Sequence, residues 1–410
     1  MKTSKKWLAP LFRQTEGVYA MAMQYLGFPV EEMQKKLDNA RALMEEQNLS
    51  GLLLTATANY YYFTGIRKLA DWATFTRPVF LLLPRKKEPV LYVQNFGYPE
   101  CRSRSFVQDI RSFPDLMTTP LEGLVSIMKE LDMDKGKVGC ELGYEQRMDM
   151  PVAAFLQLKD MLPNATFVDA AQLLWQLRMV KMPYEIECMR EANRIAAAAF
   201  ESCFTSIHEG MTEREVARKL VASMAEHGAD LPGFIIVISG TGNYDRISAR
   251  PTDRIIRKGD LVWIDAGTTY KGYWTDWCRA GVVGKPSEEQ RRLQAIIHET
   301  TMLGVQTVAP GVPVGDIWRA CEKSMLAHGL PWSFDCGRAG HGVGLQLTEP
   351  PTIAPEDDTL LQPGMVITCE PGYCNDIGCF DIEENVLVTE TGYEVLSGAR
   401  RELYEIATDC

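Results

Sequence analysis

Apolar positions in the N-terminal part of the chain alternate between helical and strand-like spacing. In residues 31–48, Met33, Leu37, Ala40 and Met44 recur at helical intervals, which predicts a helix with one buried face. Short apolar runs bounded by polar residues predict strands at residues 51–54, 79–83, 90–93 and 137–140. Strands that alternate with helices predict an α/β domain, to which we assign residues 1–178.

A second domain is predicted to begin near Met182-Pro183 and to cover residues 179–410. Residues 184–200 read as a strong helix, with Pro183 just before it. Another helix is predicted from Thr212, where Thr212 and Glu215 form a capping box. Strands dominate afterwards. The predicted strands are 234–238, 261–264, 365–369 and 380–388, and the helices between them are 288–305 and 314–328.

The composition is that of a folded protein with an acidic surface. Of 410 residues, 46% are hydrophobic and 24% are charged, and the net charge is -11. This charge argues against nucleic-acid and anionic-membrane partners. No run of 18 apolar residues predicts a membrane span. The eleven scattered cysteines suit a reducing cytoplasm, where thiols pack as small apolar groups.

Two acids flank a predicted hairpin in the second domain. The apolar run 261–264 ends at Asp265, and the chain returns through Asp276. With Tyr270 and Lys271 as a two-residue loop, the two carboxylates face each other at roughly 5 Å between Cβ atoms, although a bulge at Gly272 would shift the pairing. Close carboxylates repel each other unless a cation lies between them. The alternative is that both acids are solvated beside a turn.

A lone histidine, His341, lies among Gly340, Gly342 and Gly344. Glycines let the backbone bend closely around a site. The residues next to His341 in sequence include almost no bulky side chain that could contact or hydrogen-bond to the imidazole. Taken alone, such a histidine is more often structural.

Three further acids lie at or within apolar strands. Glu370 ends the strand 365–369, where Pro-Gly stops it. In the strand predicted for 380–388, a period of two places Asp381 and Glu383 on one face. Buried acids are costly unless they are paired or ligated. The alternatives are a solvated strand end and an edge strand with its acids in water.

Together these residues provide four ligand carboxylates and one imidazole. Two divalent ions would balance the four negative charges, which suits a two-metal site. Oxygen ligands with a single histidine favour Mn, Fe, Co or Zn in a catalytic site. The proposed ligands are Asp265, Asp276, His341, Glu370 and Glu383.

The order of these motifs resembles the pita-bread proteins, the creatinase/aminopeptidase P-like peptidase family M24. The resembling stretches are 180–186, 265–276, 340–350, 370–372 and 382–383. The resemblance implies an α+β fold, in which a C-terminal pita-bread domain follows a smaller creatinase-type α/β domain. It implies that the five residues above bind two metal ions, manganese among the candidates, with Asp276 and Glu383 touching both. It also implies that His341 and Glu370 are catalytic, with Glu370 carrying a proton, and that the protein is a homodimer.

Three positions depart from the peptidases of this family. Two histidines that usually bind substrate are replaced, one by Ser248 and the other by Thr348. The arginine that often precedes the last ligand by two residues is Asp381. A lost oxyanion donor typically costs about 2.7–4 kcal/mol, so peptide hydrolysis would be weak unless Arg246, Ser248 or Thr348 substitutes.

In the first domain, Trp72 and Arg77 lie in a loop of a kind that reaches the active site in this family. Trp72 could contact a cationic or apolar group, and Arg77 could bind a carboxylate. The alternative is ordinary packing and a surface charge.

Two functions follow from these residues. The first is a metal-dependent hydrolase that cuts a C–N bond in a small substrate such as an Xaa-Pro dipeptide. The second is a non-peptidase member of the family that acts on a small zwitterion, such as a dimethylsulfoniopropionate lyase or an ectoine- or creatine-type hydrolase. A purely binding role is opposed by the five retained ligands.

Overall fold

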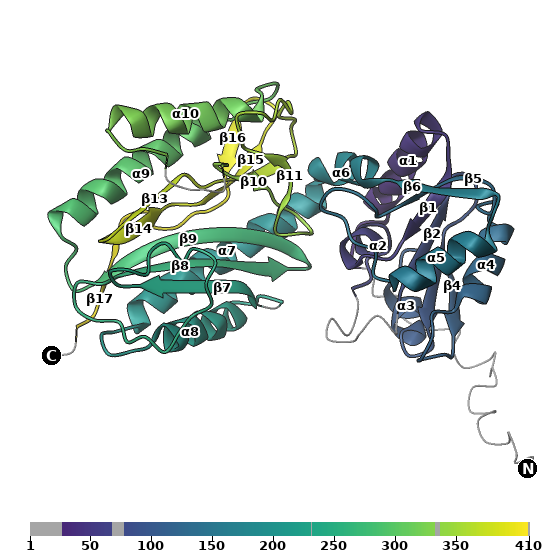
Figure 1. Cartoon of the computed structure of the whole chain (residues 1–410), viewed down its shortest axis with the longest axis horizontal. Coiled ribbons are helices and arrows are strands. Elements are labelled where there is room, and N and C mark those ends of the chain that lie inside the picture. Colours follow the sequence, from purple (N-terminus) through teal and green to yellow (C-terminus); the bar gives the residue numbers. More distant parts are fainter. Residues whose placement is uncertain (1–26, 68–77, 231, 333–336, 409–410) are drawn as a thin grey trace, which may run out of the picture. The chain divides into compact units, whose positions relative to one another are not determined.

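The computed structural model describes residues 27–67, 78–230, 232–332 and 337–408. The chain separates into two compact units (Figure 1). The first contains the N-terminal residues as far as Leu142 together with Arg147–Asp169. The second contains Gly143–Gln146 and everything from Ala170 onward. Trp72 and Arg77 lie outside the described residues.

The first unit is built on a six-stranded mixed sheet with the order β4-β3-β2-β1-β5-β6. β1 is central, because it pairs antiparallel with β2 and parallel with β5. Its strands are β1 (Leu49–Leu54), β2 (Phe80–Pro84), β3 (Val90–Gln94), β4 (Asp109–Phe113), β5 (Gly136–Cys140) and β6 (Ala165–Asp169). The strands predicted in this half are confirmed; β4 and β6 were not predicted.

Helices accompany this sheet, and the first of them matches its prediction. These helices are α1 (Val30–Glu46), α2 (Thr57–Thr64), α3 (Tyr98–Arg104), α4 (Leu121–Glu130) and α5 (Val152–Met161). Met33, Leu37, Ala40 and Met44 of α1 are all buried, as the periodicity predicted. Burying one large aliphatic side chain stabilises a fold by roughly 1.5–3 kcal/mol, so this face holds α1 in place.

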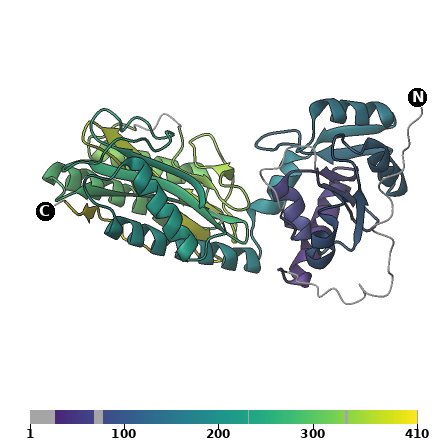
Figure 2. The same ribbon diagram turned by 90° about the horizontal axis from the view of Figure 1, so that it is seen from below.

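In the second unit, one sheet has the order β17-β9-β8-β7. Helices α7 and α8 cover one of its faces (Figure 1, Figure 2). The bounds are α6 (Ala171–Met179), α7 (Pro183–Ser206), α8 (Glu213–Glu226), β7 (Pro232–Ser239), β8 (Leu261–Tyr270), β9 (Tyr273–Val283) and β17 (Tyr404–Ile406). The capping box is present, since the Thr212 side chain accepts from the N–H of Glu215. Ala196, Phe200 and Trp277 belong to the apolar core between helix and sheet.

A second sheet of this unit has the order β11-β10-β12-β15-β16 and is accompanied by a β13–β14 hairpin. The bounds are α9 (Glu288–Gln306), α10 (Val314–Ala327), β10 (His341–Gly342), β11 (Glu349–Thr352), β12 (Val366–Cys369), β13 (Gly372–Asn375), β14 (Gly378–Asp381), β15 (Glu384–Val388) and β16 (Tyr393–Val395). α9 contacts β12, β14 and β15. Ile317 of α10 and Ile367 of β12 share one apolar core. The polar ends of these strands are thereby held on a packed scaffold.

The cysteines divide into two groups. Seven described cysteines are free and buried, which agrees with their predicted packing as small apolar residues. Cys374 and Cys379 are joined by a disulfide, which was not predicted. They are directly paired across the β13–β14 hairpin. None of the described helices is long and apolar enough to cross a membrane.

Candidate metal centre

The β8–β9 hairpin brings two of the predicted ligands to the same face, but in a different register from the one expected. Its two-residue loop is Lys271-Gly272, and both residues have positive φ, 47° and 81°. Such loops require positive φ at both positions, which glycine adopts without strain. The predicted loop at Tyr270-Lys271 is therefore wrong. Asp265 lies opposite Cys278, and Asp276 lies opposite Gly267.

The two aspartates nevertheless stay together. Asp265 pairs with Cys278 and not with Asp276, so the register differs from the expected one by two residues. Because side chains alternate between the two faces of a strand, a difference of two leaves Asp265 and Asp276 on the same face. They are diagonal neighbours, a relationship that spans about 7–8 Å. No bulge interrupts the pairing between Leu261 and Tyr270.

The glycine-rich segment fixes His341 in one orientation. Its Nδ1 lies 2.8 Å from the carbonyl oxygen of Gly342, so Nδ1–H donates and Nε2 faces the acids. Nε2 lies 3.4 Å from Oδ2 of Asp276 and 3.7 Å from Oε1 of Glu370. A Cβ at Gly340 would meet the Thr368 carbonyl oxygen at 2.3 Å. The glycines therefore permit the close backbone approach that aims this imidazole at the acids.

Glu370 and Glu383 occupy strand termini. Glu370 follows β12, and its N–H donates to the carbonyl of Ala339 at 2.9 Å. The single strand predicted for 380–388 is wrong, because β14 ends at Asp381 and β15 begins at Glu384 in another sheet. Glu383 lies in the break between them. Arg279 supports the break by donating from Nη1 to the Glu383 carbonyl at 2.8 Å.

Three of the predicted ligands converge closely. Ligand atoms of Asp276, His341 and Glu383 all lie within 4.8 Å of one another, and all three residues are buried. Asp265 and Glu370 lie farther out but interact electrostatically with them. Among the predicted metal ligands, three carboxylate oxygens are buried without a hydrogen-bond partner: Oδ1 of Asp265, Oδ1 of Asp276 and Oε1 of Glu383.

Burial and mutual repulsion shape the titration of this cluster. Burial first, and neighbouring carboxylates second, raise the pKa of Asp265 and of Glu383 well above their ordinary values. Burial also raises the pKa of Asp276, although His341 opposes the change. For His341, burial lowers the pKa, but Glu370 and Asp276 outweigh it and the net direction is upward. These groups are costly to ionise together without a cation among them.

Residues that the sequence did not single out hold the ligands in place. Asn385 hydrogen-bonds through its side chain to the backbone of Asp276. Arg279 is fully buried and pairs with Glu384 at 2.9 Å, and Arg401 pairs with the same carboxylate at 3.0 Å. A charged residue in the apolar strand 277–283 was the available signal for Arg279.

The predicted substrate residues are less closely placed. Arg246 is half-buried and Ser248 exposed in the segment between β7 and β8, and Thr348 is half-buried just before β11. Within the described residues, the side chains of these three make no hydrogen bond or ion pair. Asp381, in contrast, is buried, and it interacts electrostatically with Glu370 and Asp276.

Comparison with known proteins finds relatives along nearly the whole chain. Residues 187–390 match the metallopeptidase family M24, and residues 36–180 match the creatinase/prolidase N-terminal domain. An Xaa-Pro dipeptidase of Pyrococcus furiosus is 29% identical over 90% of this chain and 100% of its own length. An uncharacterized peptidase of Bacillus subtilis is 28% identical over 90% of this chain and 99% of its own.

Solved structures give the same result. A prolidase from Thermococcus sibiricus has a TM-score of 0.82 at 29% identity, covering 92% of this chain and 99% of the other. An Xaa-Pro dipeptidase from Bacillus anthracis has a TM-score of 0.78 at 27% identity, covering 92% of this chain and 100% of the other. Both units of the chain are covered by these similarities.

Proposed function

This chain belongs to the pita-bread peptidase family M24, and from that premise we propose that it is a dinuclear metal-dependent hydrolase that cleaves the C–N bond of Xaa-Pro dipeptides. We propose residues 179–410 as its catalytic domain and residues 1–178 as its creatinase-type domain. The observation that carries the proposal is the set of buried, unpartnered carboxylate oxygens on Asp265, Asp276 and Glu383, of which the last two residues converge with His341. Buried polar atoms are rarely left unpaired, and divalent cations would satisfy all of them.

The donor set fits two such ions. Asp276 and Glu383 are proposed to touch both, which their closeness to each other and to His341 supports. Asp265 and Glu370 would complete the set. Ions bound here would lower the pKa of water and polarise a carbonyl group. Oxygen-rich ligation with one imidazole is compatible with Mn, Fe, Co or Zn.

Glu370 is proposed to carry the proton during hydrolysis. Its side chain is 21% exposed, whereas that of Asp276 is 6% exposed and that of His341 is 2% exposed. A proton carrier must reach both the reacting water and the leaving nitrogen, so Glu370, the most exposed of the three residues, suits this role. His341 is held through its Nδ1 by the Gly342 carbonyl. We propose that it keeps Asp276 and Glu370 in position.

Substrate binding is proposed to involve Arg246, Ser248, Thr348 and Asp381, with Trp72 and Arg77 of the first domain as further candidates. Arg246 could replace a missing histidine as an oxyanion donor, because a guanidinium is always charged. Its half-buried side chain supports this role.

The test combines metal analysis with turnover. We expect two divalent ions per wild-type chain by elemental analysis and a clear loss in Asp276→Ala. The matched control is Asp316→Ala, a partly exposed aspartate of α10 whose carboxylate pairs with Arg319. Equal metal content in wild type and Asp276→Ala would remove the proposed ligand set.

For turnover, enzyme loaded with Mn, Fe, Co or Zn is assayed against Xaa-Pro dipeptides, dimethylsulfoniopropionate, creatine and ectoine. Cleavage of Xaa-Pro dipeptides is the expected outcome. Metal-loaded protein that turns over only one of the other compounds would establish the alternative, a non-peptidase acting on a small zwitterion. The relatives named above, described as dipeptidases and peptidases, support the first outcome.

We also propose a cytoplasmic homodimer. The seven buried free cysteines of the described chain support a reducing compartment, whereas the Cys374–Cys379 disulfide does not. Ultracentrifugation of the metal-loaded protein would reveal whether it is a dimer.

A further inference from the structure

Glu349 lies directly opposite the residue that orients His341. In the antiparallel pairing of β10 with β11, the partner of Glu349 is Gly342, and the Gly342 carbonyl accepts the hydrogen bond that holds the imidazole. β10 has only two residues, so its position depends on the strands on both sides of it. On the other side, Gly342 pairs with Ile367 of β12. A displacement of Glu349 would therefore be passed through Gly342 to the imidazole.

The Glu349 carboxylate folds back against the glycine-rich segment. Its Oε1 accepts from the N–H of Gln346 at 3.0 Å, and the N–H of Gly344 donates to the Gln346 carbonyl at 3.1 Å. A Cβ at Gly344 would lie 2.6 Å from Oε2 of Glu349, which is closer than real Cβ atoms approach their neighbours. The glycine therefore leaves the space that the carboxylate occupies, and the turn 344–349 closes around it.

Two buried cations hold this carboxylate in one arrangement. Arg178 donates from Nη2 to Oε1 of Glu349 and from Nη1 to the side-chain oxygen of Gln346, the latter at 2.8 Å. Nζ of Lys181 lies 3.3 Å from Oε2 of Glu349. Both carboxylate oxygens are thus engaged, and the three charged side chains are buried. Hydrogen bonds between charged partners are the stronger kind in proteins, so they fix the turn.

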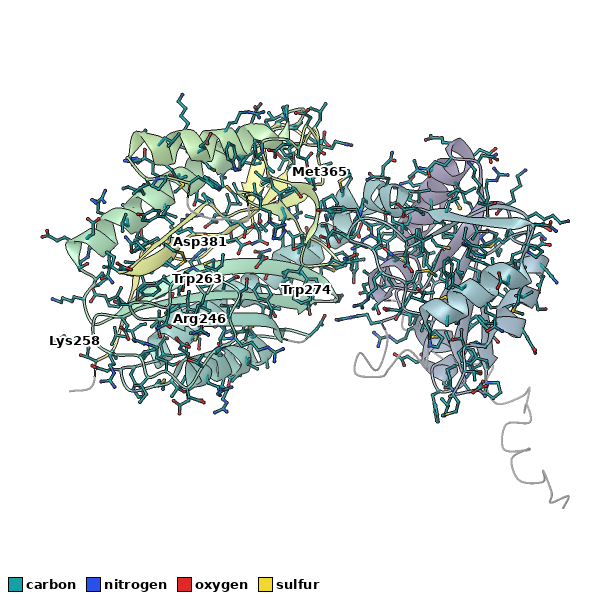
Figure 3. All side chains as sticks on the ribbon, in the orientation of Figure 1. Arg246, Lys258, Trp263, Trp274, Met365 and Asp381 are labelled. Carbon is teal, nitrogen blue, oxygen red and sulfur yellow. A yellow bond between two sulfur atoms is a disulfide. The ribbon has the colours of Figure 1, made fainter. Side chains whose placement is uncertain are left out.

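The segment that supplies these cations is anchored to the strand that leads to Glu370. Val180 pairs with Met365 just before β12 (Figure 3). The N–H of Lys181 donates to the Gly364 carbonyl at 2.9 Å. The cations therefore hold Glu349 relative to β12, which carries the next proposed ligand at its other end.

The turn also contacts the hairpin that carries Asp276. The N–H of Trp274 on β9 donates to the Gly344 carbonyl at 2.8 Å (Figure 3). Leu347 packs on Gly267, since a Cβ at that glycine would lie 3.2 Å from Cδ1 of the leucine. Gly267 is directly opposite Asp276. The turn is thus tied to the strands that supply a proposed bridging ligand.

We propose that Glu349 is a positioning residue for His341: it keeps Nε2 of the imidazole directed at the neighbouring acids that share the proposed metal site. It acts through the Gly342 backbone and not as a ligand itself. The inference rests on the proposed function and deepens it, because it gives a buried ion-pair cluster the task of orienting a proposed metal ligand. Such support from outside the ligand set typically contributes about 10–100-fold to metal affinity.

The test measures metal binding in Glu349→Gln, which keeps the shape of the side chain and removes its charge. Mn²⁺ is titrated into the metal-free full chain in a calorimeter. Co²⁺ loaded in its place reports the geometry of its ligands through its visible absorption bands. We expect Glu349→Gln to bind Mn²⁺ about 10–100-fold more weakly than wild type and to shift the Co²⁺ bands.

The matched control is Leu220→Ala in α8. Leu220 packs in the core with Val262 and Ile264, on the face of β8 opposite to Asp265. Truncating a buried leucine destabilises the fold without changing the Glu349 turn. This variant should bind Mn²⁺ and give Co²⁺ bands as wild type does. Urea unfolding of both variants allows the loss of stability to be compared with the loss of metal affinity.

Weaker binding with shifted bands in Glu349→Gln alone supports the inference. Wild-type affinity and bands in Glu349→Gln would overturn it. An equal loss of affinity in Leu220→Ala would overturn it too, because the effect would then be one of general stability. If Glu349→Gln does not fold, Arg178→Lys decides in the same way, since lysine keeps the charge but cannot span both Gln346 and Glu349. Wild type that binds neither ion would overturn the proposed function as well, whereas normal binding by wild type and variants would overturn this inference alone.

Discussion

Asn385 hydrogen-bonds through its side-chain amide to both backbone groups of Asp276. Its Oδ1 accepts from the N–H of Asp276 at 3.3 Å, and its Nδ2 donates to the Asp276 carbonyl. Asn385 is on β15 and Asp276 on β9, so this contact joins two sheets. It fixes the position of the proposed bridging ligand from outside the metal site.

Replacing Asn385 with alanine should therefore weaken metal binding without removing a ligand. Loss of such an outer contact typically costs roughly 10–100-fold in metal affinity. Titration of the apoprotein with Mn²⁺ in a calorimeter measures the effect. Asn95→Ala, at an exposed site in the first unit, is the control and should bind as wild type does. Identical affinities for all three proteins would contradict this role of Asn385.

Removing metal should destabilise the second unit, because the cluster carboxylates then repel one another. At a free metal concentration of 100 times the dissociation constant, binding adds about 2.7 kcal/mol of stability. For a unit of this size, chelation should lower Tm by roughly 5–10 °C in scanning calorimetry. Asp276→Ala should show a much smaller change on chelation. A wild-type Tm indifferent to chelator would argue against bound ions.

Glu349 neutralises two buried cations and can be tested by a single substitution. Its carboxylate hydrogen-bonds to Arg178 and lies 3.3 Å from Nζ of Lys181, and all three side chains are at most 2% exposed. Burial favours a raised pKa for Glu349, but the two cations outweigh it and the pKa is lowered. Glu349→Gln should cost about 3–5 kcal/mol in urea unfolding, since it leaves buried charges uncompensated.

The control for Glu349 is Asp316→Asn, which breaks an exposed pair with Arg319. Exposed pairs contribute about 0–1 kcal/mol. If both variants unfolded at the same urea concentration, the buried cluster would have no special stabilising role.

Glu141 should make the stability of the first unit depend on pH. It accepts hydrogen bonds from Thr55, Ala56 and Asn59. Burial nevertheless raises its pKa from 4.5 to about 7. The folded state then holds the proton more tightly than the unfolded state. The contribution of Glu141 is fully present below pH 4.5 and is lost as pH rises through about 7.

The expected loss over that interval is up to about 3 kcal/mol, which urea unfolding between pH 4.5 and 7.5 would reveal. Glu141→Gln should show a flatter profile over the same range, whatever its absolute stability. Parallel profiles for the two proteins would assign the pH dependence to other groups.

Local patterns predicted the elements well, and long-range geometry less well. The buried face of α1 and the cap at Thr212 depend on residues within one or two turns, and both were found as predicted. The hairpin register depended on which residue adopts positive φ, and Gly272 moved the loop by one position. The break at Glu383 could not be read from a run of strand formers, because the partners that produce it, Arg279 and Thr301, are distant in sequence.

The residues of the site divide in the same way: local sequence patterns identified the proposed ligands but not the residues that support them. Acids inside apolar segments identified Asp265 and Glu383, since burial without a partner is costly. Asn385 carried no such mark, and the charge of Arg279 inside an apolar strand signalled a buried partner but not which one. An asparagine or arginine acts there through backbone atoms of another strand, and only the folded sheet brings those atoms within reach.

The proposed metal ligands come from β8, β9, β10, the end of β12 and the β14–β15 break, segments that meet only when the second unit has folded. A chain in which the sheet of β8 and β9 has not yet packed against the sheet of β10, β12 and β15 cannot assemble the centre. Metal binding, and with it the proposed dipeptide hydrolysis, is thus coupled to completion of the fold of this unit. Activity per molecule becomes a direct measure of how much of a preparation is correctly folded.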